Sequence, residues 1–225
     1  MEETSAPGVR SLPVRLLQVL ISPGELFRSL KEDPRWFGAL LVGAVLVATT
    51  LLLVPTDLWV QAMRERAAAR GGEVPAFMSS MGPMLRLGTV ISALVFYFLW
   101  AFLLAGIITF VFGFLLGDEV RYGQFLSIVA HGLFITALGG ILLLPLRIIQ
   151  GDPQLNLSVG TFFFFLDDGY LFRVLKLLDL LGLWGYGVMA VGVAEMAPRR
   201  TLSFALSFFM MFALAFALLF GLFPQ

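Results

Sequence analysis

Residues 87–116 read LGTVISALVFYFLWAFLLAGIITFVFGFLL, an uninterrupted stretch without any charged side chain. A helix rises about 1.5 Å per residue, so a helical stretch of this length exceeds the ~30 Å hydrocarbon core of a bilayer. The stretch is nevertheless too short to hold two spans and a turn. It therefore predicts one long transmembrane helix that tilts or protrudes from the bilayer.

Four more apolar runs flank this stretch, at residues 37–54, 124–149, 174–194 and 202–223. The 225 residues are 59% hydrophobic and 13% charged, whereas soluble domains are about 45–50% apolar and about 25% charged. Leaving so much apolar surface in water would cost about 25 cal/mol per Å². The sequence therefore predicts an all-α integral membrane bundle, in which residues 37–225 form five transmembrane helices within the lipid bilayer.

Residues 1–36 precede the first run and are predicted to form a cytoplasmic N-terminal segment with one interfacial helix. Ser22, Pro23 and Glu25 have the spacing of a helix start, in which Ser22 is the N-cap and Glu25 completes a capping box. The apolar positions that follow share one face of this helix: Leu26, Phe27 and Leu30. Because so short a helix is marginal in water, we expect it to lie on the membrane surface.

The charged loops favour one orientation of the bundle. With a cytoplasmic N-terminus, eight of the 15 basic residues lie inside and seven lie outside. Five of the eight precede the first span, which predicts an N-terminus in the cytosol and a multi-pass protein of the inner (plasma) membrane. Residues 56–70, on the other side, predict a second surface helix that Thr56 and Asp57 can cap.

Composition excludes several kinds of chemistry. The chain has no cysteine and one histidine, which excludes disulfides, thiolate catalysis and zinc sites built from cysteines or several histidines. A net charge of zero gives no field that would favour nucleic acid. No glycine-rich loop with phosphate-binding spacing occurs. The sequence therefore predicts a protein without a cofactor and without enzymatic activity.

Small residues recur along two of the predicted spans, where they would let a neighbouring helix approach closely. The second span carries such a row at four-residue spacing: Ala101, Ala105, Thr109, Gly113 and Gly117. The fourth span carries three glycines on one face: Gly182, Gly185 and Gly192. Both rows predict packing within the bundle, with self-association or contact with a partner subunit as the alternative.

Ser127 and His131 lie one helical turn apart in the third span. A buried histidine that bonds to a neighbouring helix is the plainer interpretation, and a polar lining is the alternative. A serine and a histidine side by side also occur in hydrolases. This pair, however, comes with no oxyanion donors and no substrate cleft, so the sequence does not favour an intramembrane protease.

Two carboxylates lie near the ends of the fourth span, Asp179 at its start and Glu195 at its end. Both can reach an interface, and Asp179 could pair with Lys176 or Arg173. Neither belongs to a relay of carboxylates through the membrane centre. This pattern argues against a proton- or sodium-coupled transporter.

Two segments carry a family resemblance. Residues 16–36, LLQVLISPGELFRSLKEDPRW, resemble the surface segment that begins bacterial proteins of the Yip1 family. Residues 174–196, VLKLLDLLGLWGYGVMAVGVAEM, are similar to a second family hallmark, with Asp179, Trp184 and Gly192 at its marked positions. The resemblance implies five helices, a cytosolic N-terminus and no catalytic activity. Some bacterial relatives are associated with ABC-type exporters.

Two functions remain open on these grounds. The leading hypothesis is a non-enzymatic accessory or scaffold subunit that binds other membrane proteins, such as the permease, ATPase or adaptor of an ABC-type exporter. The alternative is a channel or carrier subunit for small solutes, with a polar cavity around His131, Ser127 and Thr109. The two differ in whether these polar groups face a cavity or are buried among apolar side chains.

Overall fold

The computed structural model describes residues 11–69, 71–72, 82–167 and 169–223. The described part of the chain is helical, and only one isolated β-bridge occurs in it. The elements are α1 (Leu12–Ile21), α2 (Pro23–Ser29), α3 (Phe37–Leu53), α4 (Thr56–Ala69), α6 (Gly82–Ile108), the π-helix η1 (Thr109–Leu115), α7 (Tyr122–Leu142), α8 (Leu144–Gln150), the 3-10 turn η2 (Val159–Phe162), α9 (Tyr170–Leu177), α10 (Leu180–Met196) and α11 (Leu202–Phe220).

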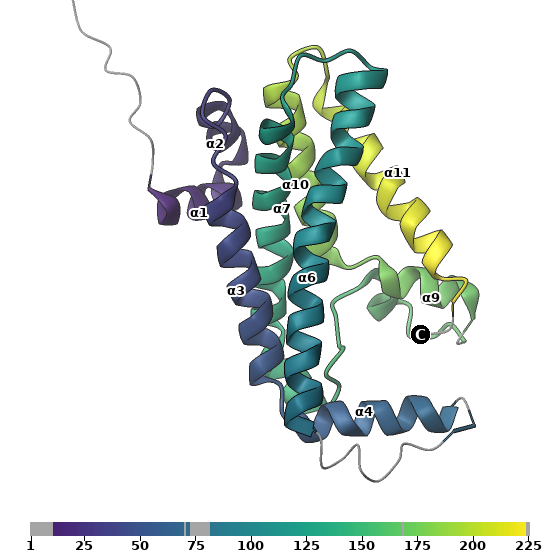
Figure 1. Cartoon of the computed structure of the whole chain (residues 1–225). Helices are drawn as coiled ribbons and strands as arrows, with labels where there is room; N and C mark the ends of the chain where they lie inside the picture. Colours follow the sequence, from purple (N-terminus) through teal and green to yellow (C-terminus); the bar gives the residue numbers. More distant parts are fainter. Residues whose placement is uncertain (1–10, 70, 73–81, 168, 224–225) are drawn as a thin grey trace, which may run out of the picture.

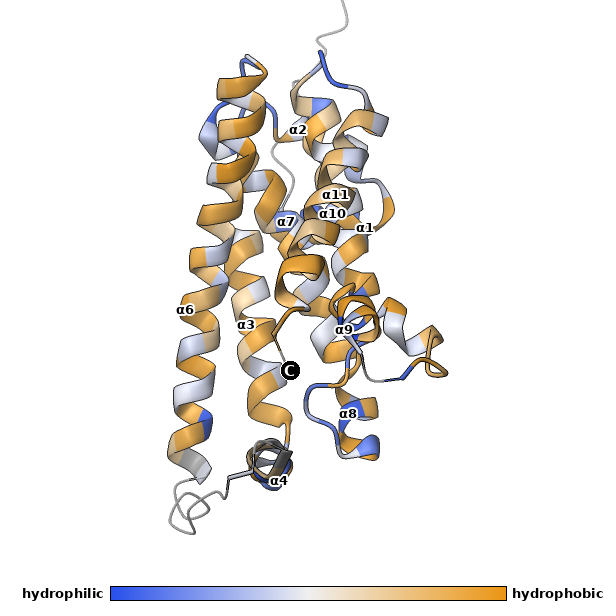
Figure 2. Cartoon of the chain, turned by 90° about the vertical axis from the view of Figure 1, so that its right-hand side faces the viewer, coloured by the Kyte–Doolittle hydropathy of each residue, from blue (hydrophilic) through white to orange (hydrophobic). Residues whose placement is uncertain are grey.

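Helix α7 is the central element of the bundle. It contacts α3, α6 and α10, and α11 packs on the outer side of α10 (Figure 1). Thirteen of the residues of α7 are buried, which is why it has no polar face. Figure 2 shows mostly apolar residues along the helices on the side of the bundle that faces the viewer, as lipid contact requires.

The number of spans is confirmed only in part. Within the described residues, three helical stretches are long and apolar enough to cross a membrane: Met84–Leu115, Tyr122–Gln150 and Leu202–Phe220. A fourth candidate is α3 together with the start of α4, which are bent by 80° at their junction. Helix α10 is apolar but has only 17 residues. The protein is therefore a multi-pass helical bundle, and a fifth crossing through α10 stays a prediction.

The sequence predicts the fourth span at residues 174–194, and the predicted start is wrong. The structure divides this run into α9 and α10, because the backbone at Asp179 is extended and forms an antiparallel bridge with Ser158. The Asp179 carboxylate then accepts a hydrogen bond of 2.7 Å from the Gly182 N–H. An aspartate at an N-cap starts a new helix here, and the new helix runs to Met196.

The second and third spans also differ in detail from the apolar runs. The second ends as a π-helix, after which Gly117 has a left-handed φ of 70° that suits glycine. The third breaks at Leu143, and Pro145 lies in the first turn of α8. Proline removes one backbone donor and is tolerated in a first turn, so the break falls before it.

The N-terminal segment forms two helices rather than one. Leu26 and Phe27 are fully buried, and α2 packs against α10, so its apolar face contacts the bundle instead of a membrane surface. The predicted capping box is wrong as well, because the Ser22 side chain makes no cap bond. Arg15 of α1 donates a 2.9 Å hydrogen bond to the Arg35 carbonyl, and burial lowers its pKa.

Helix α4 agrees with the predicted surface helix from Thr56, while Arg70, the predicted last residue, lies outside the described residues. It runs across the end of the bundle opposite α2. This end and the α2 end are therefore the two polar boundaries of the bundle, and the apolar helices run between them.

Candidate functional site

The glycines of α10 are in close contact with α7. A Cβ atom at Gly185 would lie 2.8 Å from the Gly132 carbonyl oxygen, and a Cβ atom at Gly192 would lie 2.8 Å from Ile128 Cγ1. Gly182 has a different role, because its N–H binds the Asp179 carboxylate. The backbones of the two helices thus approach each other closely at Gly132 and Gly185, and any larger side chain there would push them apart.

The row of small residues on the second span divides into two parts. Ala101 and Ala105 are fully buried in the bundle core. Thr109 donates a 2.7 Å hydrogen bond to the Ala105 carbonyl at the start of the π-helix. A Cβ at Gly113 would meet no atom closer than 3.8 Å, and one at Gly117 would meet none within 4 Å. A partner contact at these two glycines stays a prediction.

Ser127 and His131 are fully buried in the core. His131 Nδ1 lies 2.8 Å from the Ser127 carbonyl oxygen of its own helix, and the His131 ring packs edge-on against Phe27 with centroids 6.2 Å apart. The expected bond to a neighbouring helix is therefore wrong. Ser127 Oγ and His131 Nε2 have no hydrogen-bond partner among the described residues. His131 does not line the groove or the hollow described below.

A mainly apolar hollow lies elsewhere, in the half of the bundle nearer to α8. This groove has a volume of about 410 Å³ and is lined by α3, α6, α7, α8 and α10. Helix α6 packs on α3 and α7, and α10 packs on α7 and α11. Between α6 and α10 one face of α7 is left uncovered. Thr136, at mid-helix in the central α7, is exposed there for this reason.

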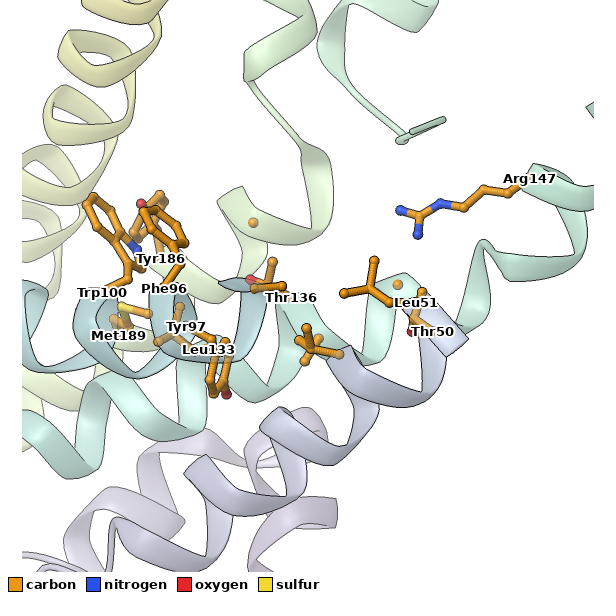
Figure 3. A pocket seen from close by; sticks show the side chains of 15 residues that line it. Thr50, Leu51, Phe96, Tyr97, Trp100, Leu133, Thr136, Arg147, Tyr186 and Met189 are labelled. Atoms are coloured by element: carbon orange, nitrogen blue, oxygen red, sulfur yellow. The ribbon is translucent and has the colours of Figure 1, made fainter. Parts of the chain in front are cut away.

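The two ends of this groove differ in chemistry (Figure 3). Aromatic side chains gather at one end, where Trp100 packs against Phe212 and Phe216 of α11 with ring centroids 6.3 and 5.5 Å apart. Arg147 of α8 lies at the other end and extends toward the lining residues. Its Nε–H donates a 2.9 Å hydrogen bond to the Leu155 carbonyl. The groove is thus aromatic at one end and cationic at the other.

Asp179 and Glu195 are both partly buried at the ends of α10. Asp179 is the helix cap already described, while Arg173 donates to the Gly221 carbonyl and Lys176 lies over the Phe172 ring, so neither forms the expected ion pair. Glu195 lies at the opposite end and pairs with Arg28 at 3.4 Å.

A second ion pair at that end joins two loops. Arg200 Nε lies 2.8 Å from Asp118 Oδ2, and the Asp118 side chain is 2% exposed. Arg200 also donates a 2.7 Å hydrogen bond to the Leu116 carbonyl. The pair therefore holds the connection between α10 and α11 against the end of the π-helix.

The model of the Yip1 domain matches residues 17–223, which is nearly the whole chain. This chain belongs to the Yip1 family. The resemblance seen in the sequence is thereby confirmed, and the family consists of non-enzymatic membrane proteins. No curated protein and no solved structure matches the chain.

Three features of this Yip1 domain are not predicted by the sequence patterns described above. Gly132 belongs to neither predicted row of small residues, although glycine in the middle of an apolar span is a packing signal. The Asp118–Arg200 pair joins residues 82 positions apart, which no local pattern reveals. The groove arises from the divergence of α6 and α10. Its one sequence signal is Arg147, a charged residue at the end of an apolar run.

Proposed function

We propose that this Yip1 domain is a non-enzymatic scaffold of the membrane, an accessory subunit that binds other membrane proteins through the α2 end of the bundle. The observation that carries the proposal is a charged surface formed there by three segments: residues 28–35, 117–121 and 197–201. These segments line one shallow hollow of about 280 Å³, together with Met196. We refer to this surface as the charged platform.

Several bonds hold the segments of the charged platform in place, either to one another or to the adjoining ends of α7 and α10. The Asp118–Arg200 pair joins the second segment to the third. Lys31 Nζ donates to the Glu195 carbonyl at 3.4 Å, and Gln124 donates to the Lys31 carbonyl at 2.5 Å. A surface that is ordered before binding loses less conformational entropy when a partner docks. This arrangement supports a docking role.

Charges of both signs are exposed on the charged platform. The basic side chains are Arg28, Lys31, Arg35, Arg121 and Arg199, and the acidic ones are Glu32, Asp33 and Glu119. An anionic membrane surface attracts basic segments and repels acidic ones. A mixture of signs instead suits a protein surface with a complementary pattern, because such patterns provide specificity.

The most concrete form of this function is an accessory role at an ABC-type exporter, as in some relatives. The N-terminus and the charged platform would then lie on the cytoplasmic side of the inner membrane, where an ATPase subunit binds. The excess of basic residues ahead of the first span supports this orientation. The solute-channel alternative has no support at His131, since the residue is fully buried.

Site-specific photo-crosslinking in intact cells tests the proposal. A photoreactive residue replaces Glu119 on the charged platform, and in the matched control it replaces Leu103, which is 57% exposed on α6. We expect a discrete adduct with another membrane protein from position 119, lost when Arg121→Glu and Arg199→Glu reverse the local charge. Adducts from position 119 with lipid only, or adducts that survive both reversals, would refute the proposal.

A further inference from the structure

We propose that the groove between α6 and α10 binds one acyl chain of an anionic phospholipid, whose phosphate faces Arg147. This binding site is independent of the charged platform, which lies at the other end of the bundle. The argument rests on the shape of the groove, its charge and the position of Arg147 along the membrane normal.

The shape favours a slender apolar ligand. A volume of about 410 Å³ falls within the ~300–1,000 Å³ that ligand pockets occupy. One hydrocarbon chain is more slender than a helix, which is about 10–12 Å wide with its side chains. A single acyl chain is therefore the occupant that we propose for the groove.

The aromatic end of the groove suits the tail of that chain. Trp100 packs on α11, and Tyr186 stacks on Phe209 with ring centroids 5.9 Å apart. These contacts hold aromatic rings at this end of the groove. Between this end and Arg147, the wall of the groove consists of Leu51, Ala137 and other apolar or small side chains. A tail entering from the α8 end would thus contact apolar atoms along its length.

The charge of the groove favours an anionic headgroup. Arg147 is the single charged residue among the described residues that line it. A guanidinium carries five N–H donors, and Leu155 accepts only the one from Nε. Two carboxylates, Asp152 and Asp179, act on Arg147 electrostatically, but each accepts a hydrogen bond from a backbone N–H. In the described part of the chain neither forms an ion pair with Arg147.

The position of Arg147 matches the depth of a phosphate. It lies three residues before the end of the apolar stretch Tyr122–Gln150. Helix α4, bent by 80° from α3, runs across the same end of the bundle. Arginine near the end of a membrane helix reaches the headgroup layer, and basic pockets between membrane helices bind anionic headgroups.

Native mass spectrometry of the full chain tests this inference. The purified protein is exchanged into detergent with equal amounts of dioleoylphosphatidylglycerol and dioleoylphosphatidylcholine. We expect one retained lipid with a preference of about tenfold for phosphatidylglycerol, because both lipids carry a phosphate but the choline cation of phosphatidylcholine is repelled by the Arg147 guanidinium. Arg147→Gln should bring the two lipids close to parity, and Arg147→Lys should keep part of the preference.

Two further variants and one added ion test whether the lipid binds in the groove and whether the whole lipid, rather than phosphate alone, is recognised. Thr136→Phe fills the groove from an exposed position and should abolish retention of both lipids, and its thermal unfolding shows whether it is folded. Arg121→Gln, at the opposite end, should leave the preference unchanged. Inorganic phosphate at millimolar concentration should not displace the lipid. Unchanged preference in Arg147→Gln, retention by folded Thr136→Phe, or displacement by phosphate alone would each overturn the inference.

Discussion

Gly132 of α7 and Gly185 of α10 lie so close that a Cβ atom on either would come within 3.0 Å of the other's carbonyl oxygen. This contact joins the central helix to the outer pair, α10 and α11. In lipid there is no hydrophobic drive for helices to associate, so close packing of this kind carries much of the association energy.

Gly185→Ala should therefore destabilise the bundle. The added methyl group would meet a backbone oxygen, and overpacking of this kind costs about 1–3 kcal/mol. The measurement is unfolding in mixed micelles of mild detergent and sodium dodecyl sulfate. Gly187→Ala is the matched control on the same helix, because a Cβ there meets nothing within 4 Å. It should stabilise the helix slightly, by about 0.5–1 kcal/mol. Equal stability of the two variants would refute this account of the crossing.

Asp118→Asn should loosen the charged platform. The substitution removes one partner of an ion pair in which Asp118 is 2% exposed and Arg200 is 21% exposed. Breaking a buried pair in this way costs about 3–5 kcal/mol. The Arg35–Asp33 pair is the exposed comparison, at 47% and 57%, so Asp33→Asn should cost about 1 kcal/mol or less. Unfolding in the same mixed micelles gives the free energy of unfolding of both variants. A smaller loss of stability for Asp118→Asn than for Asp33→Asn would contradict the prediction.

Phe27→Ala should release α2 from the bundle. The ring is fully buried against His131, and replacing a buried phenylalanine with alanine costs about 3–5 kcal/mol. Limited proteolysis of the detergent-solubilised protein should then cut between α1 and α3 much faster than in the wild type. Ile21→Ala, at a position that is 72% exposed, should leave the cleavage rate unchanged. Resistance of the Phe27→Ala protein would mean that α2 is held by other contacts.

His131 should resist diethyl pyrocarbonate in the folded protein. It is the only histidine in the chain and is fully buried, so peptide mass spectrometry can follow its modification without ambiguity. Modification should appear only after unfolding in sodium dodecyl sulfate. Rapid modification of the folded protein would reveal a water-filled path to His131 and would restore the solute-channel hypothesis.

The apolar runs predict the helices well where composition alone decides their ends. The run at residues 37–54 corresponds to α3, and the run at residues 202–223 contains α11. Prediction fails where a polar side chain acts inside a run. Asp179 adds one charge to an apolar stretch, but its carboxylate caps a new helix and divides the stretch in two.

The candidate sites were less predictable, for a geometric reason. The burial of His131 and the exposure of Thr136 depend on which faces of α7 are covered by α3, α6 and α10. Both residues lie in the same apolar helix, and the sequence around them is similar in hydropathy. Only the arrangement of the neighbouring helices distinguishes the buried face from the groove.

The charged platform can serve cytoplasmic partners only if its segments share one aqueous compartment, opposite to the α8 end. The absence of native cysteine permits a direct measurement by single-cysteine labelling. Glu119→Cys, Arg199→Cys and Gln154→Cys proteins are each treated, in intact cells, with a maleimide that does not cross membranes. The account predicts labelling at position 154 alone, with positions 119 and 199 labelled only after the membrane is opened. Labelling of position 154 and of either platform position from the same side would contradict it.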